Sequence, residues 1–223
     1  MSSPLVIVPV LNRPHRVQAL VDSFDEGLSE GELLFVVNDS DELERDALID
    51  AQAQYVVVDD EILSWPCKID WVWKNHLLPE WSLLAADDVK FYPAWWQNTA
   101  LIRNNSFIKV IGTNDLGNPS VIAGQHSCHP LVRRDFVGLD GDGPVHTGYR
   151  HWFVDNELVA TASATGSWAF CATSVVEHLH PYWGKGKMDN TYILGESESF
   201  ADSLLWEKRL PMIEELANVS RLS

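Results

Sequence analysis

The chain has 223 residues, of which 46% are hydrophobic and 22% charged, a composition typical of one domain with a sizeable core. Its formal net charge of −16, from 16 basic against 32 acidic residues, argues against nucleic acid or an anionic membrane as a partner. No apolar run approaches the length of a membrane span, and the run from Leu5 to Leu11 is too short for a signal peptide and has no basic stretch before it. We therefore expect a soluble cytoplasmic protein with reduced, scattered thiols at Cys67, Cys128 and Cys171.

The first sixty residues predict strands that alternate with helices. The run 5–11 is apolar and rich in β-branched residues, which is typical of a strand covered on both faces in a parallel sheet. Asn12-Arg13-Pro14 predicts a turn, because Pro14 suits the first turn of a helix through 17–24. A second strand is expected at 33–37. The polar residues 38–41 then offer an N-cap for a helix over 43–48, and a third strand follows at 55–58.

The same alternation continues to residue 112. We expect a helix at 69–78, a buried strand at 83–86, a helix that begins at Pro93 and runs through Ile102, and a strand at 108–112. This β-α-β-α-β order predicts a parallel, doubly wound sheet for the first half of the chain.

The second half has a less regular pattern. It predicts a strand at 127–137, a Gly/Asp-rich loop at 138–148, a short helix at 151–160 and two strands at 168–172 and 174–177. A Gly/Lys loop at 183–187 and a terminal helix at 199–216 complete the chain. Because no linker or repeat is visible, we expect one α/β domain over 1–223.

Two adjacent carboxylates, Asp87 and Asp88, end the apolar run 83–86. Burying them without partners is costly, and a divalent cation is one standard way to satisfy them. Asp39 and Asp59-Asp60 end two other predicted strands, so acids from three strands fall on one edge of the sheet. Open α/β sheets bind ligands at that edge. The alternative is a strand-end turn with solvated aspartates.

His178 and His180 follow the strand predicted at 174–177. Residues two apart in an extended chain point to the same face, so either imidazole could share a metal with the aspartate pair. Mixed carboxylate and imidazole ligands suit Mn²⁺ or Mg²⁺, whereas a tetrahedral zinc site would use more His or Cys. The alternative is an ordinary surface or capped histidine pair.

Asp155 and Glu157 follow the Gly/Asp-rich loop. A carboxylate near a metal–diphosphate centre could act as a general base, although an acidic helix start is more often a cap that suits the helix dipole. Lys185 and Lys187 could close over phosphates, or be solvated in an ordinary loop. Tryptophans are core residues by default, yet three in the second half lie near these polar groups and could stack on a sugar: Trp152, Trp168 and Trp183.

Taken together, these motifs resemble the GT-A-fold glycosyltransferases of the family 2 type, and in particular the compact bacteriophage-encoded members. No single motif is specific, and the resemblance lies in their order and spacing over most of the chain. The matching segments are Val6–Val10 with Asn12-Arg13-Pro14, Asn38-Asp39-Ser40, Lys74-Asn75, Ala86-Asp87-Asp88, Asp155-Asn156-Glu157-Leu158, His178-Leu-His180-Pro181 and Gly184-Lys185.

The resemblance implies a single GT-A (Rossmann-like) domain with a mainly parallel, mixed sheet flanked by helices. Residues 1–113 would form the nucleotide-binding half, and 114–223 the acceptor-side half with a lid loop and C-terminal helix. It implies a metal site at Asp87, Asp88, His178 and His180, and Asp155 as the catalytic base. Donor-binding residues would be Pro9, Asn12, Arg13, Asp39, Lys74, Asn75, Asp87 and Lys185, and acceptor-side residues His129, Arg133, Arg134 and Trp152.

The implied activity is that of a hexosyltransferase that uses Mn²⁺ or Mg²⁺ and a UDP- or GDP-sugar, with inversion at the anomeric carbon. The acceptor would be a glycan or a protein, a homodimer is conceivable, and a phage-encoded enzyme would work in the host cytoplasm. Two departures bear on the sites. Ala85-Ala86 precede the aspartate pair where the family usually has its first acid, and Val154 precedes Asp155 where many relatives have Glu.

Two other functions stay open. A sugar-phosphate nucleotidylyltransferase would need a Gly-rich basic loop after the first strand, but Asn12-Arg13-Pro14-His15 contains no glycine. A catalytically silent module that binds a nucleotide or glycan would show binding without turnover, and Ala85 and Val154 are compatible with it.

Overall fold

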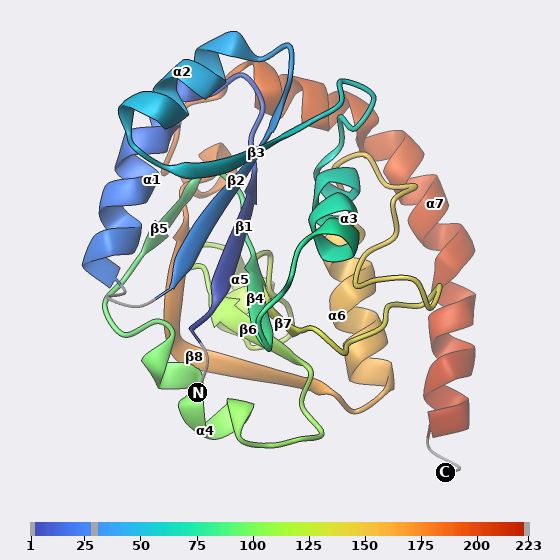
Figure 1. The fold of residues 1–223 in the computed structure, drawn as a ribbon. Coiled ribbons are helices and arrows are strands. Elements are labelled where there is room, and N and C mark those ends of the chain that lie inside the picture. Colours follow the sequence, from blue (N-terminus) through green and yellow to red (C-terminus); the bar gives the residue numbers. More distant parts are fainter. Residues whose placement is uncertain (1–2, 28–30, 221–223) are drawn as a thin grey trace.

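The computed structural model describes residues 3–27 and 31–220, and a mixed sheet lies at its centre (Figure 1). The strand order within the described chain is β3-β2-β1-β4-β7-β6-β8-β5. Four strands form the parallel part: β1 (Leu5–Pro9), β2 (Glu32–Asn38), β3 (Gln54–Val58) and β4 (Trp81–Leu84). The predicted single α/β domain architecture with a mixed sheet flanked by helices is confirmed.

The remaining strands mix the two directions. β7 is antiparallel to both β4 and β6, β8 is parallel to β6, and β5 is antiparallel to β8. Their bounds are β5 (Val89–Phe91), β6 (Val110–Asn114), β7 (Leu131–Arg133) and β8 (Trp168–His178).

Helices cover both faces of the sheet. Figure 1 shows α1 and α2 on one side, and α3, α6 and α7 on the other, with α7 outermost. The helices are α1 (Pro14–Gly27), α2 (Glu42–Asp50), α3 (Trp65–Asn75), α4 (Ala100–Arg103), α5 (Pro119–Ile122), α6 (Val154–Ala164) and α7 (Asn190–Ser220). Two 3₁₀ turns are η1 (Gln97–Thr99) and η2 (Pro181–Trp183). No described helix is long and apolar enough to cross a bilayer.

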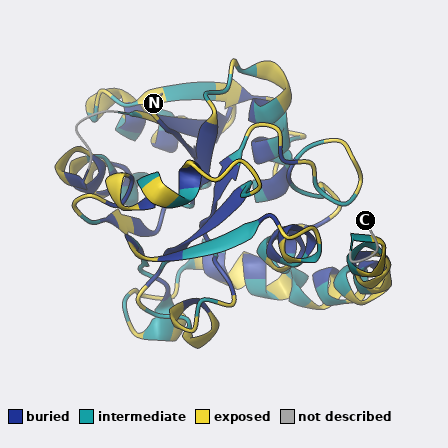
Figure 2. Ribbon diagram, turned by 90° about the horizontal axis from the view of Figure 1, so that it is seen from below, coloured by how far each residue is buried: buried dark blue, intermediate teal, exposed yellow. Residues whose placement is uncertain are grey.

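Strand β1 supplies both hydrophobic cores. Val6 and Val8 pack in the core on the α1 and α2 side, whereas Leu5 and Ile7 pack in the core on the α3 and α6 side. Each fully buried side chain of this kind contributes about 1.5–3 kcal/mol. Burial on both faces is why the first strand is an uninterrupted apolar run, and Figure 2 shows such central strands as buried.

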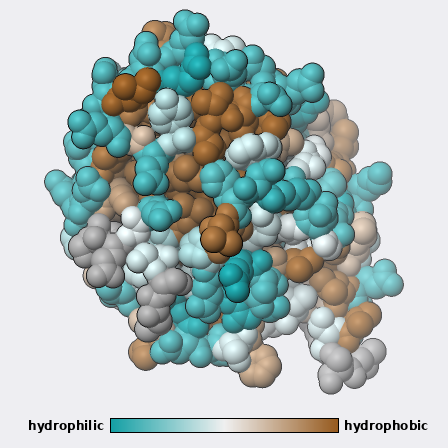
Figure 3. Space-filling view, viewed as in Figure 1, coloured by the Kyte–Doolittle hydropathy of each residue, from teal (hydrophilic) through white to brown (hydrophobic). Residues whose placement is uncertain are grey.

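Edge strand β3 is only partly covered. Val57 of β3 and Leu63 beyond it are 40% and 58% exposed. Figure 3 shows hydrophobic side chains gathered over this upper part of the face, among hydrophilic ones.

Several predicted boundaries are wrong. The strand expected at 83–86 is Trp81–Leu84, and the strand expected at 127–137 is only Leu131–Arg133, because Phe136 N–H already turns back to Arg133 O. The helix expected from Pro93 is reduced to η1 and α4. The two strands expected at 168–177 form the single strand β8, which changes partner from β6 to β5 beside an irregularity at Thr113/Asn114.

Candidate functional site

A cavity of about 560 Å³ opens at the carboxyl edge of the parallel strands. Its lining comes from the loop after β1, the start of α3, the turn after β4, α5, the segment before β7, one side of α6, the end of β8, η2 and α7. Polar side chains that are far apart in the sequence therefore meet in one place.

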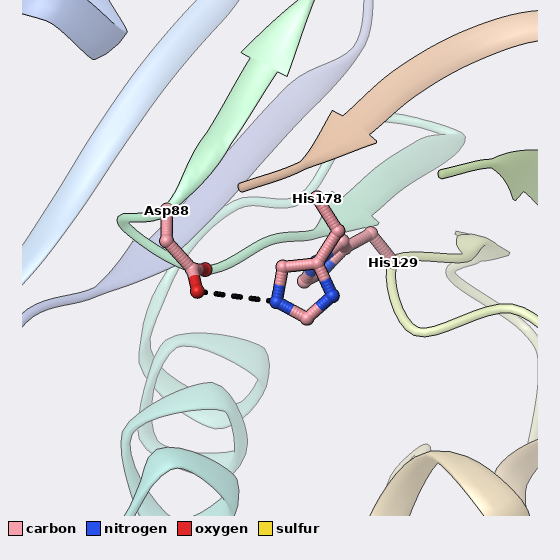
Figure 4. Close-up of side chains that lie close together, drawn as sticks. All are labelled: Asp88, His129 and His178. Carbon is pink, nitrogen blue, oxygen red and sulfur yellow. Dashed lines mark hydrogen bonds and ion pairs between the residues drawn. The ribbon is translucent and has the colours of Figure 1, made fainter. Parts of the chain in front are cut away.

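Asp88, His129 and His178 line this cavity and form a compact cluster (Figure 4). One ligand atom from each lies within 4.8 Å of the other two, and His178 Nε2 lies 3.1 Å from Asp88 Oδ2. The pairing of β5 with β8 explains the contact, because Val89 is opposite His178 and Leu179 N–H donates to Asp88 O at 2.7 Å. His129 arrives from the segment before β7, with its ring centroid 4.7 Å from that of His178.

The charges of this cluster are coupled. Burial disfavours both charged groups, but the His178 imidazole holds the pKa of Asp88 well below its usual value, and Asp88 in turn raises the pKa of His178. His129 is 5% exposed, and burial together with His178 lowers its pKa to about 3. His129 is therefore a neutral imidazole at pH 7, which is the form that binds metals.

Unsatisfied nitrogens at this position fit a cation. Neither ring nitrogen of His129 nor Nδ1 of His178 has a hydrogen-bond partner within the described chain. The Leu84 backbone lies near His129 and works against the lowering of its pKa. A buried polar atom without a partner is costly. One carboxylate and two imidazoles would suit a divalent cation that completes its shell with ligand oxygens.

Asp87 does not line the cavity and is paired with Arg13. Its Oδ1 accepts from Arg13 Nη1 at 2.8 Å, and both side chains are buried. Arg13 Nη2 donates to Asp189 Oδ1 at 2.8 Å, just before α7, and the guanidinium lies 3.8 Å from the centroid of the Tyr192 ring. Tyr192 then donates its hydroxyl to Asp88 Oδ2 at 2.7 Å. Of the two aspartates, Asp88 lines the cavity and Asp87 neutralises Arg13.

Asp155 lies in the first turn of α6 and also lines the cavity. His126 Nε2 is 3.0 Å from Asp155 Oδ2, while Asp155 Oδ1 accepts the N–H of Asn156 at 2.9 Å. Burial works against charge on both partners, yet their mutual attraction lowers the pKa of Asp155 and raises that of His126. Asp155 is thus a carboxylate held ionised by an adjacent imidazole.

The turn before α6 fixes the place of Asp155. Phe153 has φ 65° and ψ −4°, a left-handed conformation that is costly for a bulky residue and is found where surrounding structure enforces it. The enforcing group is the buried carboxylate of Asp202 on α7, which accepts the N–H groups of Arg150, His151 and Trp152 at 2.7–2.9 Å.

His180 and Lys185 both make contacts within the described chain. His180 lines the cavity, its Nδ1 accepts Tyr182 N–H at 3.2 Å and caps η2, and it is not part of the cluster of Asp88, His129 and His178. Lys185 pairs with Glu177 at 2.7 Å and donates to Leu116 O.

Other predicted residues lie outside the cavity. Lys74 pairs with Asp70 and Asp142 beside a separate hollow of about 70 Å³. Asp39 pairs with Arg45 in an exposed position. The rest of this group does not line the cavity either: Pro9, Asn12, Asn75, Arg133 and Arg134. By contrast, seven predicted residues do line it: Arg13, Asp88, His129, Trp152, Asp155, His178 and His180.

Sequence reasoning missed several lining residues. His126 and Cys128 come just before the predicted His129 in Gln125-His126-Ser127-Cys128-His129, and this density of His and Cys was an available signal. Tyr192 and Trp206 gave no such signal in the sequence, because they lie on a helix whose sequence pattern does not reveal which face meets the cavity.

Comparison with known proteins gave matches to solved structures. No protein-family model matches the chain, and no curated protein sequence matches it significantly. A mannosyltransferase, PcManGT from Pyrobaculum calidifontis in complex with GDP-Man and Mn²⁺, superposes with a TM-score of 0.61 at 13% identity over 99% of this chain and 75% of that chain. Glucosyl-3-phosphoglycerate synthase from Mycobacterium tuberculosis, in complex with Mn²⁺ and UDP-glucose, superposes with a TM-score of 0.62 at 13% identity. The match covers 91% of this chain and 78% of that chain.

The fold is of the GT-A type. A further complex of the M. tuberculosis synthase, with Mn²⁺, UDP-glucose and phosphoglyceric acid, covers 97% of this chain and 80% of its own at a TM-score of 0.60 and 12% identity. At such identities the likeness establishes the fold.

Proposed function

We propose that the protein is a metal-dependent glycosyltransferase that moves a sugar from a nucleoside-diphosphate donor to an acceptor hydroxyl, with inversion. The observation that carries this proposal is the placement of Asp88, His129, His178 and Asp155 in one cavity at the carboxyl edge of a GT-A sheet. The similar structures hold GDP-Man or UDP-glucose with Mn²⁺, and UDP with Mg²⁺.

Asp88, His129 and His178 would hold the Mn²⁺ or Mg²⁺. The cation would neutralise the diphosphate as a Lewis acid, which makes the diphosphate a better leaving group. This role accounts for phosphate binding by a protein of net charge −16. Arg13 would add a positive charge when donor phosphate replaces Asp189 as its partner.

Asp155 would accept the proton of the acceptor hydroxyl during attack on the anomeric carbon. Its low pKa keeps it ionised at neutral pH, and the partner of its Oδ2, His126, holds it in place. The family 2 and bacteriophage resemblance, the cytoplasmic location, the two functional halves and the homodimer stay predictions.

Thermal unfolding with UDP and GDP, each with and without Mn²⁺, tests the site. We expect a rise in Tm that needs both nucleotide and metal, because a ligand present at 100 times its Kd stabilises the native state by about 2.7 kcal/mol. Asp88→Asn should abolish the metal-dependent rise, and the exposed control Asp25→Asn on α1 should keep it. The site assignment is wrong if no nucleotide gives a metal-dependent shift in the wild-type protein.

Replacement of the proposed base tests the chemistry. In Asp155→Asn, nucleotide binding should be retained, whereas nucleoside-diphosphate release from UDP-glucose or GDP-mannose in the presence of acceptors should slow by about 10²–10⁴-fold. The exposed Asp25→Asn on α1, outside the cavity, is the matched control. An unchanged rate in Asp155→Asn would remove Asp155 from the mechanism, and nucleotide binding without any turnover would favour the silent binding module.

A further inference from the structure

Four aromatic side chains from three segments line the cavity, and together they are called its aromatic wall. This aromatic wall consists of Trp152 before α6, Tyr182 and Trp183 of η2, and Trp206 of α7. The Trp152 and Tyr182 ring centroids are 6.0 Å apart, and Trp206 stacks on Phe153 at 6.3 Å with 15° between the ring planes. None of the four is fully buried, and Tyr182 is 51% exposed, so ring surface remains available to a ligand.

The wall is preorganised. Trp152 Nε1 donates to Gly195 O at 3.0 Å, and its backbone N–H donates to Asp202. Trp183 lies directly on Gly117, where a Cβ would come within 2.7 Å of the indole Cδ1. These contacts fix the two indoles before any ligand arrives, which lowers the entropic cost of binding.

The polar groups beside the wall are mostly neutral. Side-chain amides and hydroxyls of Asn118, Ser120, Gln125, Asn156 and Ser163 line the same cavity. Such groups can donate to and accept from hydroxyls without carrying charge.

The charges that are present disfavour an anion near Asp155. Among the described lining residues, Arg13 is the only Lys or Arg, and it is already paired with Asp87 and Asp189 at 2.8 Å. Asp88 and Asp155 add two carboxylates. Each carboxylate already has an imidazole partner, His178 for Asp88 and His126 for Asp155. An anionic acceptor would therefore find no unpaired Lys or Arg among the described lining residues, whereas a neutral polyol needs none.

We propose that the aromatic wall and these amides bind an uncharged glycan, which serves as the acceptor. The C–H faces of a sugar ring carry slight positive charge and pack on the negative faces of aromatic rings, while its hydroxyls reach the amides. Asp155 lines the same cavity as these aromatic side chains, so a bound glycan can present a hydroxyl to that carboxylate. The acceptor role rests on the proposed function, whereas glycan binding does not.

A glycan array probed with the full chain, in the presence of UDP and Mn²⁺, tests the binding. We expect signal on neutral glycans, and at least tenfold weaker binding of the best one in Trp206→Ala, measured by titration calorimetry. Phe200→Ala, 72% exposed on the same helix and outside the cavity, is the matched control. Tyr182→Ala replaces Trp206→Ala if the latter does not fold, since the Tyr182 side chain is half exposed.

Three results would overturn the proposal. They are signal confined to sialylated, sulfated or phosphorylated glycans, no signal at all, or neutral-glycan binding that survives both wall substitutions. The nucleotide-dependent Tm rise is measured separately. A Tm rise with no glycan signal refutes this inference alone, whereas glycan binding without the Tm rise refutes the proposed transferase and leaves a glycan-binding protein.

Discussion

His126 is the residue on which the ionisation of Asp155 depends. Burial is the largest influence and would raise the pKa of Asp155, but the contact at 3.0 Å with the imidazole and the hydrogen bond from Asn156 N–H together lower it. His126 is thus a positioning residue in the proposed mechanism, and its effect should be visible in a pH profile rather than only in a rate.

In His126→Gln we expect the pKa of Asp155 to rise, because burial persists while the positive charge is lost. A base must be ionised, so the acidic limb of kcat/KM should move to higher pH, with a smaller loss of rate well above that limb. The exposed His15→Gln on α1 serves as the control. A uniform loss of activity with an unmoved acidic limb would mean that His126 acts only through packing.

At the residue scale, the sequence predicted some features of the site but not which partner each side chain meets. The aspartate pair was found because two adjacent acids after an apolar run are unusual, yet the sequence does not tell that Asp87 faces Arg13 and Asp88 faces the cavity. His129 was expected on the acceptor side and His180 at the metal. His129 lies beside Asp88, and His180 lines the same cavity while its Nδ1 caps η2. The contacts of Asp87 with Arg13 and of Asp88 with His178 join segments far apart in the chain, which no local pattern encodes.

At the scale of elements, the turn before α6 depends on one carboxylate of α7. Asp202→Ala would leave three backbone N–H groups without their acceptor. We expect a loss of about 3 kcal/mol in the free energy of unfolding, since hydrogen bonds to charged groups contribute about 1.5–3 kcal/mol each and water can replace part of them. Urea unfolding measures the loss, and the exposed Glu207→Ala on the same helix is the control.

The same substitution has a functional consequence. Without Asp202, the left-handed Phe153 loses the contacts that enforce it, and both Trp152 and Asp155 lose their fixed positions. Catalysis should therefore fall even where Asp202→Ala remains folded, while nucleotide binding at Asp88 should persist. Loss of nucleotide binding alone would place the role of Asp202 elsewhere.

Elements buried on two faces were the most predictable. β1 and β2 are continuous apolar runs because each strand faces two cores, and Pro14 correctly marked the start of α1. β5 was missed because Val89-Lys90-Phe91 is too short to show a period. β8 was split in two because it borders two partners and its burial changes along its length. Segments whose structure depends on a partner give weak local signals.

At the scale of the whole molecule, the two halves of the sequence are interleaved in the sheet. β7 from the second half lies between β4 and β6 of the first, and β5 from the first half pairs with β8 of the second. The buried Arg209 of α7 adds a bidentate ion pair with Glu157 of α6 at 2.6 and 2.8 Å. Within the described chain, strands β5 and β6 of the first half therefore join the sheet only through β7 and β8 of the second.

We expect unfolding of the full chain to be a single cooperative transition, although many chains beyond about 150 residues depart from two-state behaviour. Val6 and Ile7 face opposite cores from one strand, so losing either core removes the support of the other. Urea unfolding followed by far-UV circular dichroism and by tryptophan fluorescence should give coincident curves, because tryptophans pack in both cores. Two separated midpoints would mean that the nucleotide-side and acceptor-side halves are energetically independent, despite the shared sheet.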